Sequence, residues 1–135
     1  MRFMVIVKSN GNCATAAAPD SNFVTAMRKF NDDLAAAGVL LALEGLHPVS
    51  KGARATPVAG KWKISDGPFA ETKELIGGYW LWQVNSREEA LEWIKRCPLP
   101  AHAESEIELR QVLDTQEFAA QLAPAFTQRA QRTAA

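Results

Sequence analysis

Short segments with the alternating pattern of β-strands recur along the chain. The segment 2–8 is apolar on both faces, as expected of an interior strand, whereas Ile107 and Leu109 alternate with charged residues, as expected of a half-exposed strand. Glycine, proline or polar residues separate the segments. The pattern predicts four main strands, over residues 2–8, 39–43, 79–84 and 106–110.

Two other segments have the spacing of amphipathic helices. In 23–37, apolar residues recur every three or four positions, and Gly38 suits the left-handed residue that ends a helix. The second helix begins with an S-x-x-E capping box at 86–89 and ends before Pro98. Each helix follows a predicted strand, so the chain alternates between the two kinds of element.

A shorter strand pattern lies in the irregular stretch 44–78. Trp62 and Ile64 alternate with lysines, which predicts a strand over 60–65 with one wet face, and 58–61 has the composition of a hairpin turn. The order is therefore strand, helix, strand, hairpin, strand, helix, strand. It predicts an α+β fold, a ferredoxin-like split βαβ sandwich with a hairpin insertion.

The length of 135 residues suits one hydrophobic core. We expect one domain over 1–113, followed by a C-terminal helix and a frayed tail over 114–135. The helix is expected within 116–126, because 127–135 has no apolar periodicity.

The charge balance excludes several classes of partner. Lysine plus arginine and aspartate plus glutamate both number 15, so no broad field attracts nucleic acid or anionic lipid. No apolar run approaches the roughly 20 residues of a spanning helix, and the apolar N-terminus is too short for a signal peptide. We expect a cytoplasmic protein with no nucleic acid or membrane partner, in which Cys13 and Cys97 are reduced thiols. The sequence has no metal-ligand spacing and indicates no cofactor.

A four-stranded sheet with helices on one face leaves its other face open. Trp62, Trp80 and Trp82 lie on strands whose covered face has room for only some of these rings. We therefore expect a two-fold homodimer with these strands near the interface. In the alternative, residues 116–126 fold back over the sheet within one subunit.

The candidate chemistry lies between Glu44 and Glu74. Glu44 and His47 stand three positions apart where a predicted strand ends, which provides a carboxylate and an imidazole for acid/base work. The alternative is a histidine that only hydrogen-bonds its loop, and His102 is a competing imidazole in a solvated loop. The pair 77–78 is either a glycine bulge or a place where the backbone approaches a ligand closely.

The nine residues 66–74, DGPFAETKE, followed by GGY at 77–79, resemble the signature of the DGPF-domain branch of the YCII-related family. The motif EGLHP at 44–48 adds to this resemblance, which covers residues 1–112. It implies a dimeric α+β barrel with a pocket in each subunit. Family members are mostly of unknown activity; a few resemble small-molecule lyases, and some occur with extracytoplasmic-function sigma factors. Small members carry a histidine in the first helix, which residues 21–37 lack.

Two classes of function stay open. In the first, His47 transfers a proton on a small anionic or phenolic compound in a lyase or isomerase reaction, and Arg54 binds a carboxylate or an oxyanion. In the second, the same pocket binds a ligand without turnover as a regulatory module, with a sigma factor as a partner by resemblance only. The expected site residues are His47 and Asp66 for catalysis and Glu44, Arg54, Glu71 and Lys73 for binding.

Overall fold

The computed structural model describes residues 1–9, 21–69, 75–98 and 105–122. The strands are β1 (Arg2–Ser9), β2 (Leu40–Gly45), β3 (Ala53–Val58), β4 (Lys61–Asp66), β5 (Leu75–Gln83) and β6 (Glu106–Gln111). The helices are α1 (Ser21–Ala36) and α2 (Arg87–Arg96), with a short 3-10 helix η2 (Val49–Lys51), and residues 115–122 are also helical. The elements follow one another as the sequence predicts.

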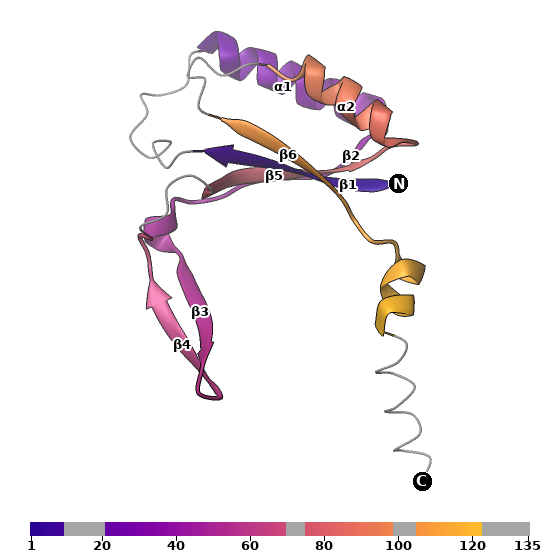
Figure 1. The fold of residues 1–135 in the computed structure, drawn as a ribbon. Helices are drawn as coiled ribbons and strands as arrows, with labels where there is room; N and C mark the ends of the chain where they lie inside the picture. The colour runs from indigo at the N-terminus through magenta and orange to yellow at the C-terminus, as the bar shows by residue number, and fades with distance from the viewer. Residues whose placement is uncertain (10–20, 70–74, 99–104, 123–135) are drawn as a thin grey trace.

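One antiparallel sheet is formed by β2, β5, β1 and β6, in that order. Both α1 and α2 lie on the same face of this sheet (Figure 1). The hairpin β3–β4 is inserted between β2 and β5 and forms a separate two-stranded sheet. The predicted α+β, ferredoxin-like split βαβ arrangement with a hairpin insertion is confirmed.

The core lies between the sheet and the helices. Phe30 of α1 meets the rings of Trp80 and Trp82 edge to face, with centroids 6.1 and 6.2 Å apart. Leu34 and Val5 are fully buried beside them. These contacts join α1 to the two central strands.

The helix-covered face has room for two of the three tryptophans, Trp80 and Trp82. Both rings are buried on the helix-covered face, opposite Val5 and Phe3 in the β1–β5 register. They share this face because residues two apart on a strand point the same way. Trp62 behaves differently and is 70% exposed.

The open face of the sheet has an apolar centre, which is smaller than the core on the helix-covered face. Met4 lies opposite Leu81, and Ile6 opposite Tyr79, and all four side chains are half-buried. Toward one end, Lys8 on β1 forms a 3.3 Å ion pair with Glu108 on β6. This face is therefore apolar in the middle and charged at its margin.

The β3–β4 hairpin extends away from the sheet, on the side opposite the helices (Figure 1). Its turn residues Ala59 and Gly60 have φ of 50° and 79°, as a two-residue hairpin turn requires, so the predicted turn is confirmed. Every residue in its two strands is exposed. The expectation of a single wet face is wrong, because the hairpin packs on neither the sheet nor the helices.

The predicted helix ends are confirmed. Ser86 Oγ caps α2 by accepting a hydrogen bond from Glu89 N at 3.1 Å, whereas Glu89 Oε2 accepts its hydrogen bond, at 2.9 Å, from Asn85 N, one residue before the cap. Gly38 follows α1 with φ of 73°.

The described part of the C-terminal helix, residues 115–122, points away from the sheet (Figure 1). The alternative in which this segment folds back over the sheet is wrong for these residues, and Phe118 is 54% exposed. The predictions for Cys13, His102 and the tail 127–135 lie outside the described residues. Among the helices of the described ranges, none has both the length and the hydropathy to cross a membrane.

Candidate functional site

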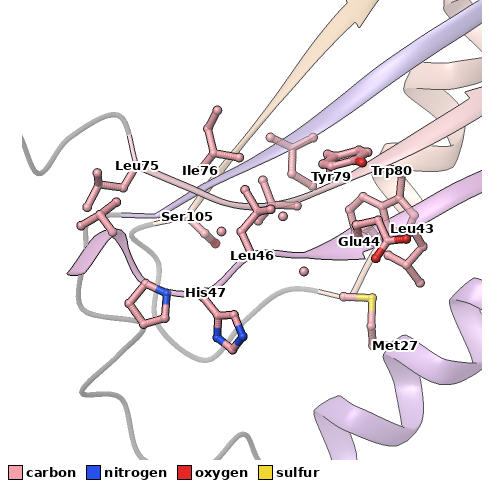
Figure 2. A pocket seen from close by; sticks show the side chains of 18 of the residues that line it. Met27, Leu43, Glu44, Leu46, His47, Leu75, Ile76, Tyr79, Trp80 and Ser105 are labelled. Atoms are coloured by element: carbon pink, nitrogen blue, oxygen red, sulfur yellow. The ribbon is translucent and has the colours of Figure 1, made fainter. Parts of the chain in front are cut away.

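A cavity of about 680 Å³ lies at the end of the sheet where β2 leaves it (Figure 2). This volume is within the range of roughly 300–1,000 Å³ that is typical of small-molecule sites. Val7 and Ile107, which are paired across β1 and β6, form part of one wall, and Phe23 and Met27 of α1 form another. Other lining residues include Leu43, Glu44, Leu46, His47, Pro48, Val49, Pro68, Ile76, Tyr79, Trp80, Cys97 and Ser105.

Two glycines shape the strand that forms the cavity wall. In the β1–β5 register Val7 faces Gly78 and Lys8 faces Ile76, so Gly77 is an extra residue on β5. The predicted glycine bulge is therefore confirmed. A Cβ on Gly78 would lie 2.8 Å from the Glu44 carbonyl oxygen, so glycine is needed for β2 to approach β5.

The end of β2 and the segment that follows it carry the polar side chains. Leu46 N donates to Gly77 O at 2.9 Å and holds this segment against β5. His47 and Glu44 both line the cavity (Figure 2), so the structure brings these two predicted residues to one site. Within the described ranges neither side chain has a hydrogen bond or an ion pair, with the other or elsewhere, so both are available to a bound molecule.

Two other predicted residues lie on the hairpin. Arg54 is on β3, and its guanidinium carbon stacks 4.0 Å from the centroid of the Phe69 ring. Asp66 ends β4 opposite Ala53. Neither lines the cavity, and no hydrogen bond or ion pair joins Asp66 to His47 among the described residues. Glu71 and Lys73 lie outside the described residues.

Cys97 follows α2 and lines the cavity as a half-buried thiol. Burial raises its pKa, which keeps the thiol protonated and disfavours nucleophilic chemistry. The described residues contain no cluster of His, Cys, Asp and Glu that would hold a metal ion.

Sequence reasoning did not identify the apolar walls as part of the site. Phe23 and Met27 were expected on the core-facing stripe of the first helix, and they have the same periodicity as the buried Phe30. Periodicity identifies the inward face of a helix but does not indicate where that face lacks an opposing layer. No signal in the sequence distinguishes these lining residues from core residues.

Residues 1–116 match the YCII-related domain family. The chain is also 39% identical over 59 residues to an uncharacterised protein of Rhizobium meliloti (strain 1021), a match that covers 44% of this chain and 48% of the relative. The aligned part thus spans about half the length of that relative. The family match covers α1, α2 and the strands β1 to β6, from Arg2 to Gln111. The chain therefore belongs to the YCII-related family.

Proposed function

We propose that the protein binds a small, largely apolar molecule with a hydroxyl group, such as a phenol, in the cavity beneath α1. The observation that carries this proposal is that the cavity wall has an apolar part and a polar part. Val7, Met27 and Trp80 belong to its apolar part, whereas His47 and Glu44 provide hydrogen-bonding groups on the segment at the end of β2. Sites for small molecules commonly combine an apolar wall with a few polar groups that orient the ligand.

The charges of the wall favour a hydroxyl over a carboxylate on the ligand. The described lining residues include no lysine or arginine, and Arg54 is stacked on Phe69 away from the cavity. The carboxylate of Glu44 repels an anion but accepts a hydrogen bond from a hydroxyl, as does a neutral imidazole. A phenol therefore fits this wall better than an aromatic acid.

Calorimetric titration with p-cresol, toluene and 4-methylbenzoate tests this preference. We expect p-cresol to bind most tightly, because only p-cresol satisfies both the apolar wall and the acceptors. His47→Gln should raise the dissociation constant of p-cresol by about 10-fold, which corresponds to the loss of one hydrogen bond, and should leave the dissociation constant of toluene unchanged. Tighter binding of 4-methylbenzoate than of p-cresol would contradict the proposed ligand class.

A cavity-filling variant tests the location of the site. Met27→Trp places a larger side chain in the cavity and should abolish binding of p-cresol. Val24→Trp is the matched control, since Val24 lies on the same helix, is exposed and does not line the cavity. Equal binding by the two variants would exclude the cavity as the site.

A second candidate function is proton transfer to the bound molecule by His47. It is favoured by one observation: the imidazole lines the cavity with no hydrogen-bond or ion-pair partner in the described part of the chain. Ligands found by titration should be incubated with the protein and analysed for products. If turnover is found, His47→Gln should lower it by about 2 to 4 orders of magnitude. Ligands recovered unchanged would leave the binding module as the function.

We also propose that two copies pair through the open faces of their sheets. Met4, Ile6, Tyr79 and Leu81 lie side by side on this face, which neither α1 nor α2 covers. At micromolar concentration the chain should sediment at twice its mass of 14.8 kDa. Ile6→Lys should produce monomers, whereas Val24→Lys, on the exposed side of α1, should not.

Three further predictions from the sequence are part of what we propose: the DGPF branch of the family, the cytoplasmic location and a sigma factor as partner. The DGPF branch is supported by the motif at 66–74, and a cytoplasmic location is consistent with the free thiol of Cys97. A sigma factor as partner stays a prediction from the resemblance alone.

A further inference from the structure

The sheet contributes no side chain to one part of the cavity wall. Gly45 of β2 lies opposite Gly78 of β5, and both line the cavity beneath α1. They are two residues along their strands from Leu43 and Trp80, which form the neighbouring cross-strand pair on the helix-covered face. Because residues two apart on a strand share a face, side chains at these two positions would point toward the helices. The two glycines therefore leave bare backbone on that face.

The first turns of α1 line the same cavity as this bare backbone. Farther along the helix, Phe30 is buried against the rings of Trp80 and Trp82. Met27 and Phe23, one and two turns before Phe30, line the cavity instead. In the core both layers supply side chains, whereas at the glycine pair β2 and β5 supply only backbone. The missing side chains leave space between the helix and the sheet.

Nothing in the described backbone requires a glycine at position 45. No atom of the described residues lies within 4 Å of the place where its Cβ would stand. Among the described glycines φ is positive at Gly38 and Gly60, so Gly45 has a conformation that alanine also adopts. Gly78 differs, because a Cβ there would lie 2.8 Å from the Glu44 carbonyl oxygen. Alanine in place of Gly45 would therefore change one thing, the free space in the cavity.

The bare backbone has about the extent of one aromatic ring. Neighbouring strands lie about 4.8 Å apart, and side chains of one face repeat about every 6.7 Å along a strand. Two missing neighbours thus expose an area on which a six-membered ring can lie flat. Trp80 borders this area and lines the cavity, which permits an edge-to-face contact with such a ring. Glycine in a strand often marks a place where a ligand approaches the backbone closely.

We propose that Gly45 determines the specificity of the cavity by admitting a flat aromatic ring against the backbone of Gly45 and Gly78. The inference rests on the proposed binding of a phenol and adds where the ring of that ligand lies. Met27 lies on the helix side of the ring, and Trp80 lies at its edge. The hydroxyl group is then next to His47, which follows Gly45 by two residues and lines the same cavity. A saturated ring is thicker and makes fewer contacts with the flat backbone, so the site selects aromatic over saturated alcohols.

Nuclear magnetic resonance of protein labelled with ¹³C-glycine tests the position of the ring directly. The face of an aromatic ring shields the protons beneath it, so the Hα signals of Gly45 and Gly78 should shift upfield when p-cresol binds. Gly38, Gly52 and Gly60 do not line the cavity, and their signals should stay in place. The control ligand, 4-methylcyclohexanol, has no aromatic ring and should produce no such shift. Bound p-cresol that leaves the Gly45 and Gly78 signals unshifted would overturn the proposal.

Gly45→Ala tests the specificity. It adds one methyl group to the cavity without a clash, so the variant should be at least as stable to heat as the wild type. Calorimetry should show that the dissociation constant of p-cresol rises by about 10-fold or more, the effect of one extra methyl group in an apolar pocket. Gly52→Ala is the matched control, since it makes the same change outside the cavity and its Cβ would meet Val49 O at 3.4 Å. Equal dissociation constants for the two variants would show that Gly45 does not set the specificity.

The outcomes separate this proposal from the one on which it rests. A wild-type chain that binds no p-cresol overturns both. If the wild type binds p-cresol and Met27→Trp abolishes this binding, the cavity is the site. Unshifted glycine signals and an unchanged affinity of Gly45→Ala would then overturn the position of the ring alone.

Discussion

The indole Nε1 of Trp80 donates a hydrogen bond of 2.9 Å to Oδ1 of Asn31. This bond joins the buried face of β5 to α1 and satisfies a polar group inside the core. The indole nitrogen of the neighbouring Trp82 is buried without a partner among the described residues. Of these two core tryptophans, Trp80 therefore has its polar group satisfied by α1.

Asn31→Leu should lower the free energy of unfolding by about 1–3 kcal/mol, because it leaves the Trp80 N–H buried and unpaired. Urea denaturation followed by tryptophan fluorescence measures the change. The double variant Asn31→Leu, Trp80→Phe should lose less than the sum of the two single losses. Strict additivity would show that the bond contributes nothing to stability.

Ser86→Ala should destabilise the protein by about 1 kcal/mol, because it removes the acceptor for Glu89 N at the start of α2. Thr25→Ala, at an exposed position inside α1, is the control and should be neutral or slightly stabilising. Thermal unfolding compares the two. Equal melting temperatures for Ser86→Ala and the wild type would show that this cap does not stabilise the helix.

Gly67→Ala should disturb the root of the hairpin. A Cβ at this position would fall inside the contact distance of the Val49 carbonyl oxygen, and Gly67 N donates to Gly52 O at 2.9 Å. We expect a loss of about 1–3 kcal/mol, as for other overpacked sites, and weaker p-cresol binding because Val49 lines the cavity. Gly52→Ala is the matched control, since its Cβ would meet the same oxygen at 3.4 Å. Similar stability and affinity for the two variants would contradict this reading of the hairpin root.

Cys97 should react slowly with iodoacetamide at pH 7–8. Its pKa is raised by burial, so the reactive thiolate is scarcer at a given pH than in an unfolded chain. In a Cys13→Ser background, the alkylation rate should be lower than that of the urea-unfolded protein at the same pH, and p-cresol should lower it further. A native rate as fast as the unfolded one would show that the thiol is not shielded.

Much of the local structure could be predicted from the sequence. The side-chain cap of Ser86, the left-handed Gly38 and the turn at Ala59–Gly60 depend on neighbours within four residues, and each is present. The order of strands and helices was also predictable, because the periods of 2 and 3.6 residues are local properties. The β2–β5–β1–β6 topology followed from this order and the split βαβ rule.

The candidate site was predictable only in part. The EGLHP segment pointed to Glu44 and His47, and both line the cavity, because one is the next-to-last residue of β2 and the other follows it within three residues. Arg54 and Asp66 were expected beside them, but they belong to the hairpin, which carries them out of the cavity wall. The direction in which an inserted hairpin leaves a sheet depends on packing at its root, at Gly67 and Val49, and not on its own alternation.

The sequence by itself determined which side chains of each strand share a face, but the tertiary structure decided which face the helices cover. Trp80 and Trp82 share a face by alternation, and they are buried because Phe30 of α1 packs on that side. Trp62 has the same alternating neighbourhood and stays exposed because neither the sheet nor the helices of the described ranges pack on its hairpin. Alternation is a property of the backbone, whereas burial depends on contacts between residues far apart in sequence, and only the assembled layers determine those contacts.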